Sequence, residues 1–177
     1  MSYKITGTGS CIPDITKKNS DFLKNKFLNI DGGKFQSSNS EIIEKFNSIT
    51  GIYERRYAPD EINSSDLAAV AAGIAINDSK LDQETLDYII VAHNTGDISC
   101  SSGQVDTLPS IASKVKAKLK IKNPNCVAYD IICGCPGWVE GVIQAKSFIK
   151  SGMAKKCLVI GCDTLSRILD ENDRDSM

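Results

Sequence analysis

Short apolar runs alternate with helical stretches along most of this 177-residue chain. Residues 86–92, 126–132 and 157–162 are rich in β-branched side chains, which is typical of strands buried on both faces of a sheet. Helical patterns over residues 109–119 and 137–151 separate these runs. Because parallel strands are joined by helical crossovers, this order predicts an α/β fold with a mostly parallel sheet covered on both faces.

Four further segments complete the predicted organisation. Residues 3–11 predict a first strand, and residues 40–48 predict a short amphipathic helix. Ser64-Ser65-Asp66 is typical of the start of a helix, and an alanine-rich apolar stretch follows it. Residues 94–107 are polar and predict a loop.

The composition excludes several classes of function. The formal net charge is -1 and no basic cluster carries interleaved aromatic residues, so we expect no nucleic-acid partner. No apolar run approaches the ~18 residues that a membrane span needs, so we expect no membrane association. The first residues lack the apolar core of a signal peptide, and we therefore expect a cytoplasmic location.

Seven cysteines are present, an odd number that argues against a disulfide framework. Cys126 and Cys157 lie within apolar runs and are expected to pack as small buried side chains. Cys133 and Cys135 are separated by a single residue, which is tighter than the usual spacing of zinc ligands. We therefore expect no metal site.

Cys135 lies where a buried strand runs into a tight turn and a helix begins. Pro136 follows it at the predicted first helical position. Backbone N–H groups at a helix N-terminus favour negative charge, so a thiol there gains thiolate character and becomes a nucleophile. Cys133 lies nearer the strand and is expected to point into packing, which makes it the weaker candidate. From position alone, Cys135 could equally be a small residue in a tight turn.

A series of motifs along the chain resembles the beta-ketoacyl-acyl-carrier-protein synthase III family of the thiolase-like fold. No single motif is specific, but their order and spacing together are. They are Lys4-Ile-Thr-Gly-Thr-Gly-Ser10, Thr50-Gly51-Ile52, Glu54-Arg55-Arg56, the strand 87–92, Leu108-Pro109-Ser110, Asp130-x4-Cys135-x-Gly137, Leu158-Val-Ile-Gly161, Leu165-Ser166-Arg167 and Asp173-Arg174.

The resemblance implies a fold for the whole chain. Residues 1–177 would form the N-terminal half of a duplicated, layered αβαβα fold, and the C-terminal half would be absent from this chain. A half of such a fold exposes an apolar face, so we expect self-association. Family members are homodimers, and this half supplies most of their interface.

The resemblance also implies an activity, that of an acyltransferase in fatty-acid or related lipid or polyketide synthesis. Cys135 would take an acyl group from a thioester, with its own N–H as one oxyanion-hole donor. The acyl-enzyme would then condense with a malonyl thioester as carbon dioxide is lost. The family's catalytic histidine and asparagine come from the second half; His93 does not match that histidine, and no asparagine matches the second partner. We expect His93 to be a loop-edge or interface residue and the chain alone to be incomplete for the full reaction.

Substrate contacts are implied in the same way. Arg174 matches a family arginine that helps to hold coenzyme A, whereas the positions of the family's other two adenine-binding residues carry Lys45 and Ile49. The acyl donor is therefore expected to be either acyl-coenzyme A or an acyl-carrier-protein thioester, with acyl carrier protein as a partner and no permanently bound cofactor. Trp138 and Leu108 depart from the common pattern and suggest a specialised acyl chain.

Two other interpretations stay open. A half-fold could be a non-catalytic structural partner of a complete synthase, although the retained Cys135 motif argues modestly against this. The chain could also belong to another condensing enzyme of the thiolase-like fold, of the hydroxymethylglutaryl-coenzyme A synthase type.

Overall fold

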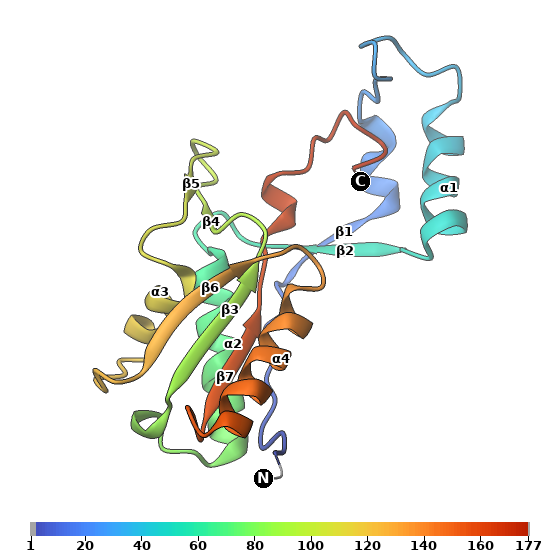
Figure 1. Cartoon of the computed structure of the whole chain (residues 1–177). Coiled ribbons are helices and arrows are strands. Elements are labelled where there is room, and N and C mark those ends of the chain that lie inside the picture. Colours follow the sequence, from blue (N-terminus) through green and yellow to red (C-terminus); the bar gives the residue numbers. More distant parts are fainter. Residues whose placement is uncertain (1–2, 177) are drawn as a thin grey trace. The chain divides into compact units, whose positions relative to one another are not determined.

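The computed structural model describes residues 3–176, which form two compact units (Figure 1). The larger unit contains Asp60–Thr164 together with the segment that ends at Ile12. The smaller unit contains Pro13–Pro59 together with the segment that begins at Leu165.

A three-stranded parallel sheet forms the centre of the larger unit. Its strands are β3 (Tyr88–His93), β6 (Val127–Ile132) and β7 (Cys157–Gly161), in the order β6-β3-β7. Val91 of β3 is paired with Asp130 on one side and with Ile160 on the other. The three apolar runs therefore form the parallel sheet that their sequences predict.

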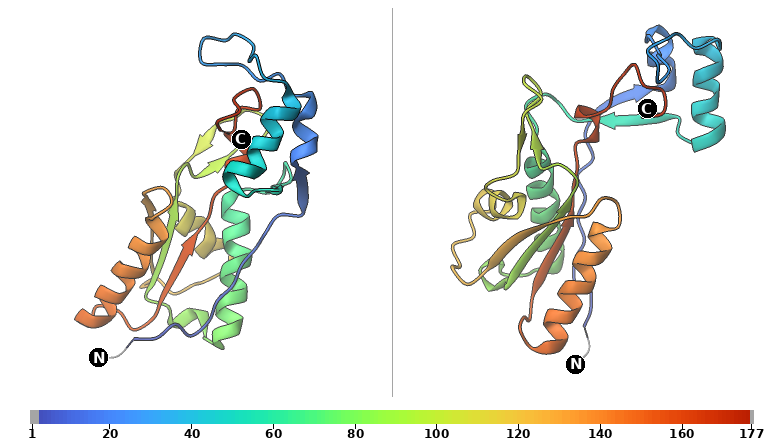
Figure 2. Two further views of the ribbon diagram at one scale, coloured as in Figure 1. Left: turned by 90° about the vertical axis from the view of Figure 1, so that its right-hand side faces the viewer. Right: turned by 45° about the horizontal axis from the view of Figure 1, so that its top comes forward.

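Helices cover both faces of this sheet, as Figure 2 shows from two directions. They are α2 (Ser64–Ser79) and α3 (Ile111–Lys118) on one face and α4 (Gly137–Ser151) on the other. Side chains alternate along each strand: Ile89 and Val91 of β3 lie in the core under α2 and α3, whereas Ile90 faces Gly141 of α4. This two-sided burial explains why the strand β3 is apolar from Ile89 to Ala92.

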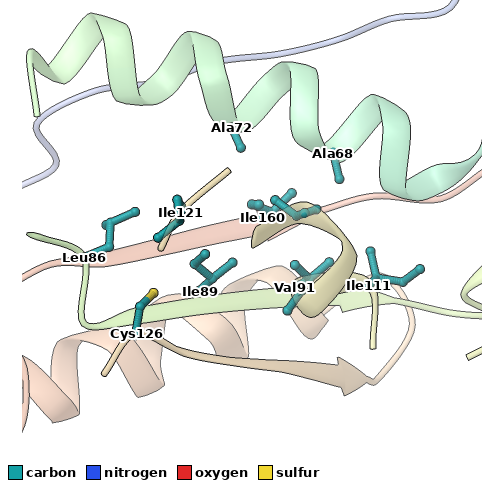
Figure 3. Close-up of a cluster of buried hydrophobic side chains, with 11 residues drawn as sticks. Ala68, Ala72, Leu86, Ile89, Val91, Ile111, Ile121, Cys126 and Ile160 are labelled. Atoms are coloured by element: carbon teal, nitrogen blue, oxygen red, sulfur yellow. The ribbon is translucent and has the colours of Figure 1, made fainter. Parts of the chain in front are cut away.

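The main core lies between the sheet and the helices α2 and α3 (Figure 3). Ala68 and Ala72 place small side chains on the inner face of α2, so this helix approaches β7 closely. Ile111 and Val115 of α3 are fully buried on the same face of the sheet. The alanine-rich stretch therefore packs on the sheet, although its outer face is exposed.

The segment predicted as a polar loop contains a small antiparallel sheet. Its strands are β4 (Asp97–Ile98) and β5 (Val105–Asp106). The backbone N–H and the hydroxyl of Ser65 donate to the two Asp97 carboxylate oxygens, both over 2.8 Å. Lys114 Nζ donates to both Asp97 and Asp106. Asp97 is thus buried but paired, which its polar sequence surroundings did not indicate.

The strand predicted over residues 3–11 is not present: no strand is found across residues 3–14. A Cβ on Gly7 would lie 2.4 Å from the Ala75 carbonyl oxygen, and a Cβ on Gly9 would lie 2.2 Å from the Ala71 carbonyl oxygen. The backbone therefore lies directly against helix α2, and within residues 3–176 the segment has no ladder partner. The two glycines serve this close approach.

The smaller unit is built on the antiparallel pair β1 (Ile15–Lys18) and β2 (Glu54–Tyr57). The helix α1 (Asn39–Thr50) begins at a capping box formed by Ser38 and Glu41. Its buried Phe46 makes edge-on contacts with two further aromatic rings, Phe22 and Phe27. Short 3-10 helices occupy Asn19–Lys24 and Leu165–Arg167 here, and Gln83–Thr85 in the larger unit.

The outer face of α4 is apolar and exposed. Trp138, Val139 and Ile143 are each about half exposed. This is the kind of face that is expected to drive self-association. No helix within residues 3–176 is long and apolar enough to cross a membrane.

Candidate active site

Cys135 lies in the turn that joins strand β6 to helix α4. Gly134, directly before it, has a φ of +51°, a conformation that favours glycine. The Gly137 N–H donates to the Gly134 carbonyl oxygen over 3.1 Å, which closes the turn. The Cys135 side chain is exposed. The sharp turn thus presents the thiol at the end of the sheet, as the sequence predicts.

Helix α4 begins directly beside this thiol. Pro136 is the N-cap residue, one position before the first helical residue Gly137 and not itself the first helical residue as the sequence predicted. It has no side chain that could accept a hydrogen bond from the first turn. The N–H groups of that first turn and the helix dipole therefore favour a negative charge at this point. A Cβ on Gly137 would lie 3.1 Å from the Ala92 Cβ, so the start of the helix lies tightly against the end of β3.

A cavity of about 240 Å³ opens next to Cys135. It is lined by residues at the ends of two neighbouring strands, Ala92 and Gly161, and by Trp138, Cys162 and Asp163. The Trp138 side chain lies over Gly161, where a Cβ would come within 3.3 Å of it. Small, aromatic, thiol and acidic residues therefore meet at this cavity.

Three other cysteines are buried or partly buried, and their thiols have raised pKa values. Burial, with a smaller contribution from the Asp163 carboxylate, raises the pKa of the Cys162 thiol to about 12. Burial and the Asp87 carboxylate raise the pKa of Cys157 to about 11, and burial also raises the pKa of Cys126. These three cysteines stay protonated at neutral pH and are poor nucleophiles. Burial of Cys126 and partial burial of Cys157 confirm the sequence prediction.

The prediction that Cys133 points into packing is wrong, because its side chain is exposed. β6 is an edge strand, and its last residues reach the open end of the sheet, where Ile132 is also exposed. Burial therefore does not show which of Cys133 and Cys135 is the nucleophile. The choice between them depends on their places in the turn, where Cys135 directly precedes the start of α4.

Within residues 3–176 no group of three or more potential ligands could hold a metal ion.

His93 is buried, at the position next to the following turn that the sequence predicts. It is the last residue of β3. Its Nδ1 accepts a hydrogen bond from the Gly96 N–H over 2.9 Å, so Nε2 carries the proton and donates to Asp130 Oδ2 over 3.0 Å. Both ring nitrogens are engaged, and the ring does not line the cavity at Cys135.

Asp130 connects this histidine to helix α3. Its carboxylate also accepts the backbone N–H groups of Ile111 over 2.6 Å and Ala112 over 2.8 Å. Burial alone would raise the pKa of Asp130, but the hydrogen bonds from His93, Ala112 and Ile111 outweigh it and hold the pKa below its ordinary value. The aspartate of the Asp130-x4-Cys135 motif therefore fixes the strand that leads into the turn.

Arg174 lies in the smaller unit, whereas Cys135 lies in the larger one. Its guanidinium stacks over the Phe35 ring at 4.1 Å, and its Nε donates to Asp175 over 3.0 Å. Both Arg174 and Phe35 line a cavity of about 690 Å³. Ile49, where the family pattern has an adenine-binding residue, is exposed on α1. Sequence patterns do not single out Phe35, because it lies in a loop without periodicity.

Comparison with solved structures places this parallel α/β sheet, with its exposed cysteine at a helix N-terminus, in the thiolase-like class of folds. The 3-oxoacyl-acyl-carrier-protein (ACP) synthase III family matches residues 129–177. The beta-ketoacyl-acyl-carrier-protein synthase III of Neisseria gonorrhoeae (strain NCCP11945) is 40% identical over 175 residues, which are 98% of this chain and 48% of that protein. A beta-ketoacyl-acyl-carrier-protein synthase III 1 of Vibrio cholerae is 36% identical over 177 residues, 100% of this chain and 49% of that protein.

Solved structures show the same similarity to synthases of this kind. The 3-oxoacyl-acyl-carrier-protein synthase III of Aquifex aeolicus VF5 superimposes with a TM-score of 0.75 at 34% identity, over 97% of this chain and 48% of that one. The corresponding synthase of Thermus thermophilus gives a TM-score of 0.76 at 31% identity, over 98% of this chain and 46% of that one. Over nearly its whole length the chain is similar to beta-ketoacyl-acyl-carrier-protein synthases III. It spans about half the length of the relatives that it matches.

Proposed function

We propose that Cys135 is the nucleophile of an acyl-transfer reaction. Its thiolate attacks the carbonyl carbon of an acyl thioester, a new carbon–sulfur bond forms, and the donor's own thiolate leaves. The observation that carries this proposal is the exposed Cys135 thiol at the uncapped start of α4. The first-turn N–H groups there favour both the thiolate and the developing oxyanion.

The acyl-enzyme would then undergo a decarboxylative Claisen condensation. A malonyl thioester loses carbon dioxide, the resulting enolate attacks the acyl carbonyl carbon, and the Cys135 thiolate is released. The names of the relatives indicate that acyl carrier protein carries the product, in fatty-acid or related lipid synthesis. His93 is an unsuitable catalyst for decarboxylation because both of its ring nitrogens are engaged in the fold. We therefore assign acylation to this chain and expect the condensation to need residues beyond these 177.

Arg174 and Phe35 support a coenzyme A thioester as the donor. A guanidinium over an aromatic ring is a flat, cationic surface on which a nucleobase can stack. The cavity next to it is also lined by Asp170, Asp173 and Asp175, whose charges oppose the binding of phosphates. We therefore propose that this site holds the base of the donor and leaves its phosphates in solvent.

The experiment is intact-protein mass spectrometry after incubation with a panel of acyl thioesters, from acetyl to decanoyl, on coenzyme A and on acyl carrier protein. We expect a mass increase of one acyl group in the wild-type chain and in C133S, and no increase in C135S. Cys133 is the matched control because it is also exposed and lies in the same turn. Equal acylation of C135S and the wild type would refute the assignment.

A further inference from the structure

A pair of polar side chains, Asn94 and Asp163, joins the ends of two neighbouring parallel strands beside the Cys135 turn. Asn94 follows β3, and Asp163 lies just beyond β7. The Asn94 backbone N–H donates to Asp163 Oδ1 over 2.9 Å, and its Nδ2 donates to Asp163 Oδ2 over 2.6 Å. One residue thus holds both oxygens of the carboxylate, which fixes its position and orientation.

The amide oxygen of this pair lies close to the turn. Because Nδ2 of Asn94 is committed to Asp163, the amide oxygen Oδ1 points away from the carboxylate and toward the turn. A Cβ on Gly134 would lie 3.4 Å from this oxygen. Gly134 directly precedes the nucleophile, and its positive φ makes the direction of the turn depend on this one residue. Asp163 lines the same cavity as Gly134 and Cys135.

We infer that Asn94 and Asp163 are positioning residues for the acylation of Cys135. They hold the Gly134 turn so that the sulfur faces the cavity and the first-turn N–H groups of α4. The inference rests on the proposed function, since acylation is the reaction that needs this geometry. A displacement of about 1 Å at a reacting atom can cost about 100-fold in rate, so a side-chain pair remote from the substrate can control the reaction.

Charge-swapped variants test the pair. N94D places two carboxylates against each other and removes the donor to Asp163 Oδ2. The double variant N94D/D163N restores both hydrogen bonds, because the new amide at position 163 donates to the new carboxylate and accepts the backbone N–H of residue 94. The double variant also keeps the net charge of the wild type. N125D is the matched control, because Asn125 is exposed and distant from the turn in sequence.

Two rates are measured for each variant by mass spectrometry: acylation of Cys135 by the best donor, and alkylation of Cys162 by iodoacetamide. We expect N94D to lower the acylation rate about tenfold or more, with Cys162 still protected, and N94D/D163N to recover to within about threefold of the wild type. The protection of Cys162, which lies next to Asp163, reports whether the strand ends stay folded.

The other outcomes overturn the inference in distinguishable ways. If N94D acylates as fast as N125D, the pair has no role in positioning. If Cys162 becomes reactive in N94D and the double variant does not recover, the pair holds the fold and nothing more. If the wild type accepts no donor at all, the proposed function fails, and the inference fails with it.

Discussion

Asp130 offers the sharpest test of how the fold supports the Cys135 turn. Its carboxylate accepts three donors: the backbone N–H groups of Ile111 and Ala112 and the Nε2–H of His93. In D130N, one carboxylate oxygen becomes an NH2 group that must face at least one of these donors. His93 cannot adapt by changing its tautomer, because a proton on Nδ1 would then face the Gly96 N–H. Neither orientation of the new amide satisfies every donor.

The magnitude follows from the burial of the site, since the Asp130 side chain is only 11% exposed. A hydrogen bond to a charged group contributes about 1.5–3 kcal/mol, and a buried donor left without a partner adds about 1 kcal/mol or more. We therefore expect D130N to lower the free energy of unfolding by about 3 kcal/mol at pH 7. With a urea dependence of about 2 kcal/mol per molar, the midpoint shifts down by about 1.5 M.

The difference in the free energy of unfolding between the wild type and D130N should depend on pH in a definite direction. The pKa of Asp130 is lower in the folded chain than in the unfolded chain, so the stabilisation is fully present at neutral pH. As the pH falls below about 4, the unfolded chain takes up the proton first, and the stabilisation is lost. The difference between the wild type and D130N should therefore shrink in acid.

The assay is urea unfolding followed by circular dichroism at pH 7 and at pH 3 to 4. D31N is the matched control, because it makes the same chemical change at an exposed carboxylate. If D130N is as stable as D31N at pH 7, or if its deficit does not depend on pH, the hydrogen-bonding argument is refuted.

Three further outcomes follow from the structure. At pH 8 a thiol with a pKa of about 12 is ionised to only ~10⁻⁴, whereas an ordinary thiol with a pKa of about 8.5 is ionised to about a quarter. Cys162 should therefore react with iodoacetamide at least about 1,000-fold more slowly than the cysteine of an unstructured peptide, and comparable rates in peptide mapping would contradict this. A Cβ on Gly141 would lie 2.8 Å from Val159 Cγ1, so G141A should lower the free energy of unfolding by about 1 kcal/mol in urea unfolding. V159A should relieve that cost, and additive effects of G141A and V159A in the double variant would exclude the clash. The exposed apolar face of α4, which includes Trp138, should make the chain self-associate, and a monomeric mass in light scattering would contradict this.

The strands and helices of the larger unit could be predicted from the sequence because their patterns are local. The three apolar runs and the glycine at position 152, which ends α4 with a φ of +80°, specify their elements without reference to distant residues. The segment at residues 3–11 has the same kind of pattern, but a strand also needs a neighbour to pair with. Pattern alone therefore predicted a strand there that the structure does not contain.

The candidate site was predictable only in part, for a similar reason. The turn at Cys135 is specified by adjacent residues, so its position followed from the sequence. The burial of His93 depends on Asp130 and Gly96, which reach it from another strand and from the following turn. The pairing of Asn94 with Asp163 spans two strand ends that are far apart in sequence. Contacts of this kind carry no local signal.

The most direct test of the central claim is the location of the acyl group after reaction with a thioester. The chain would be incubated with an acyl-coenzyme A, digested, and mapped by tandem mass spectrometry with and without hydroxylamine, which cleaves thioesters. We expect one acyl group on the peptide that contains Cys135, attached to that sulfur and removed by hydroxylamine. An acyl group found on Cys133 or on a lysine, or none on any residue with the fold intact, would contradict it.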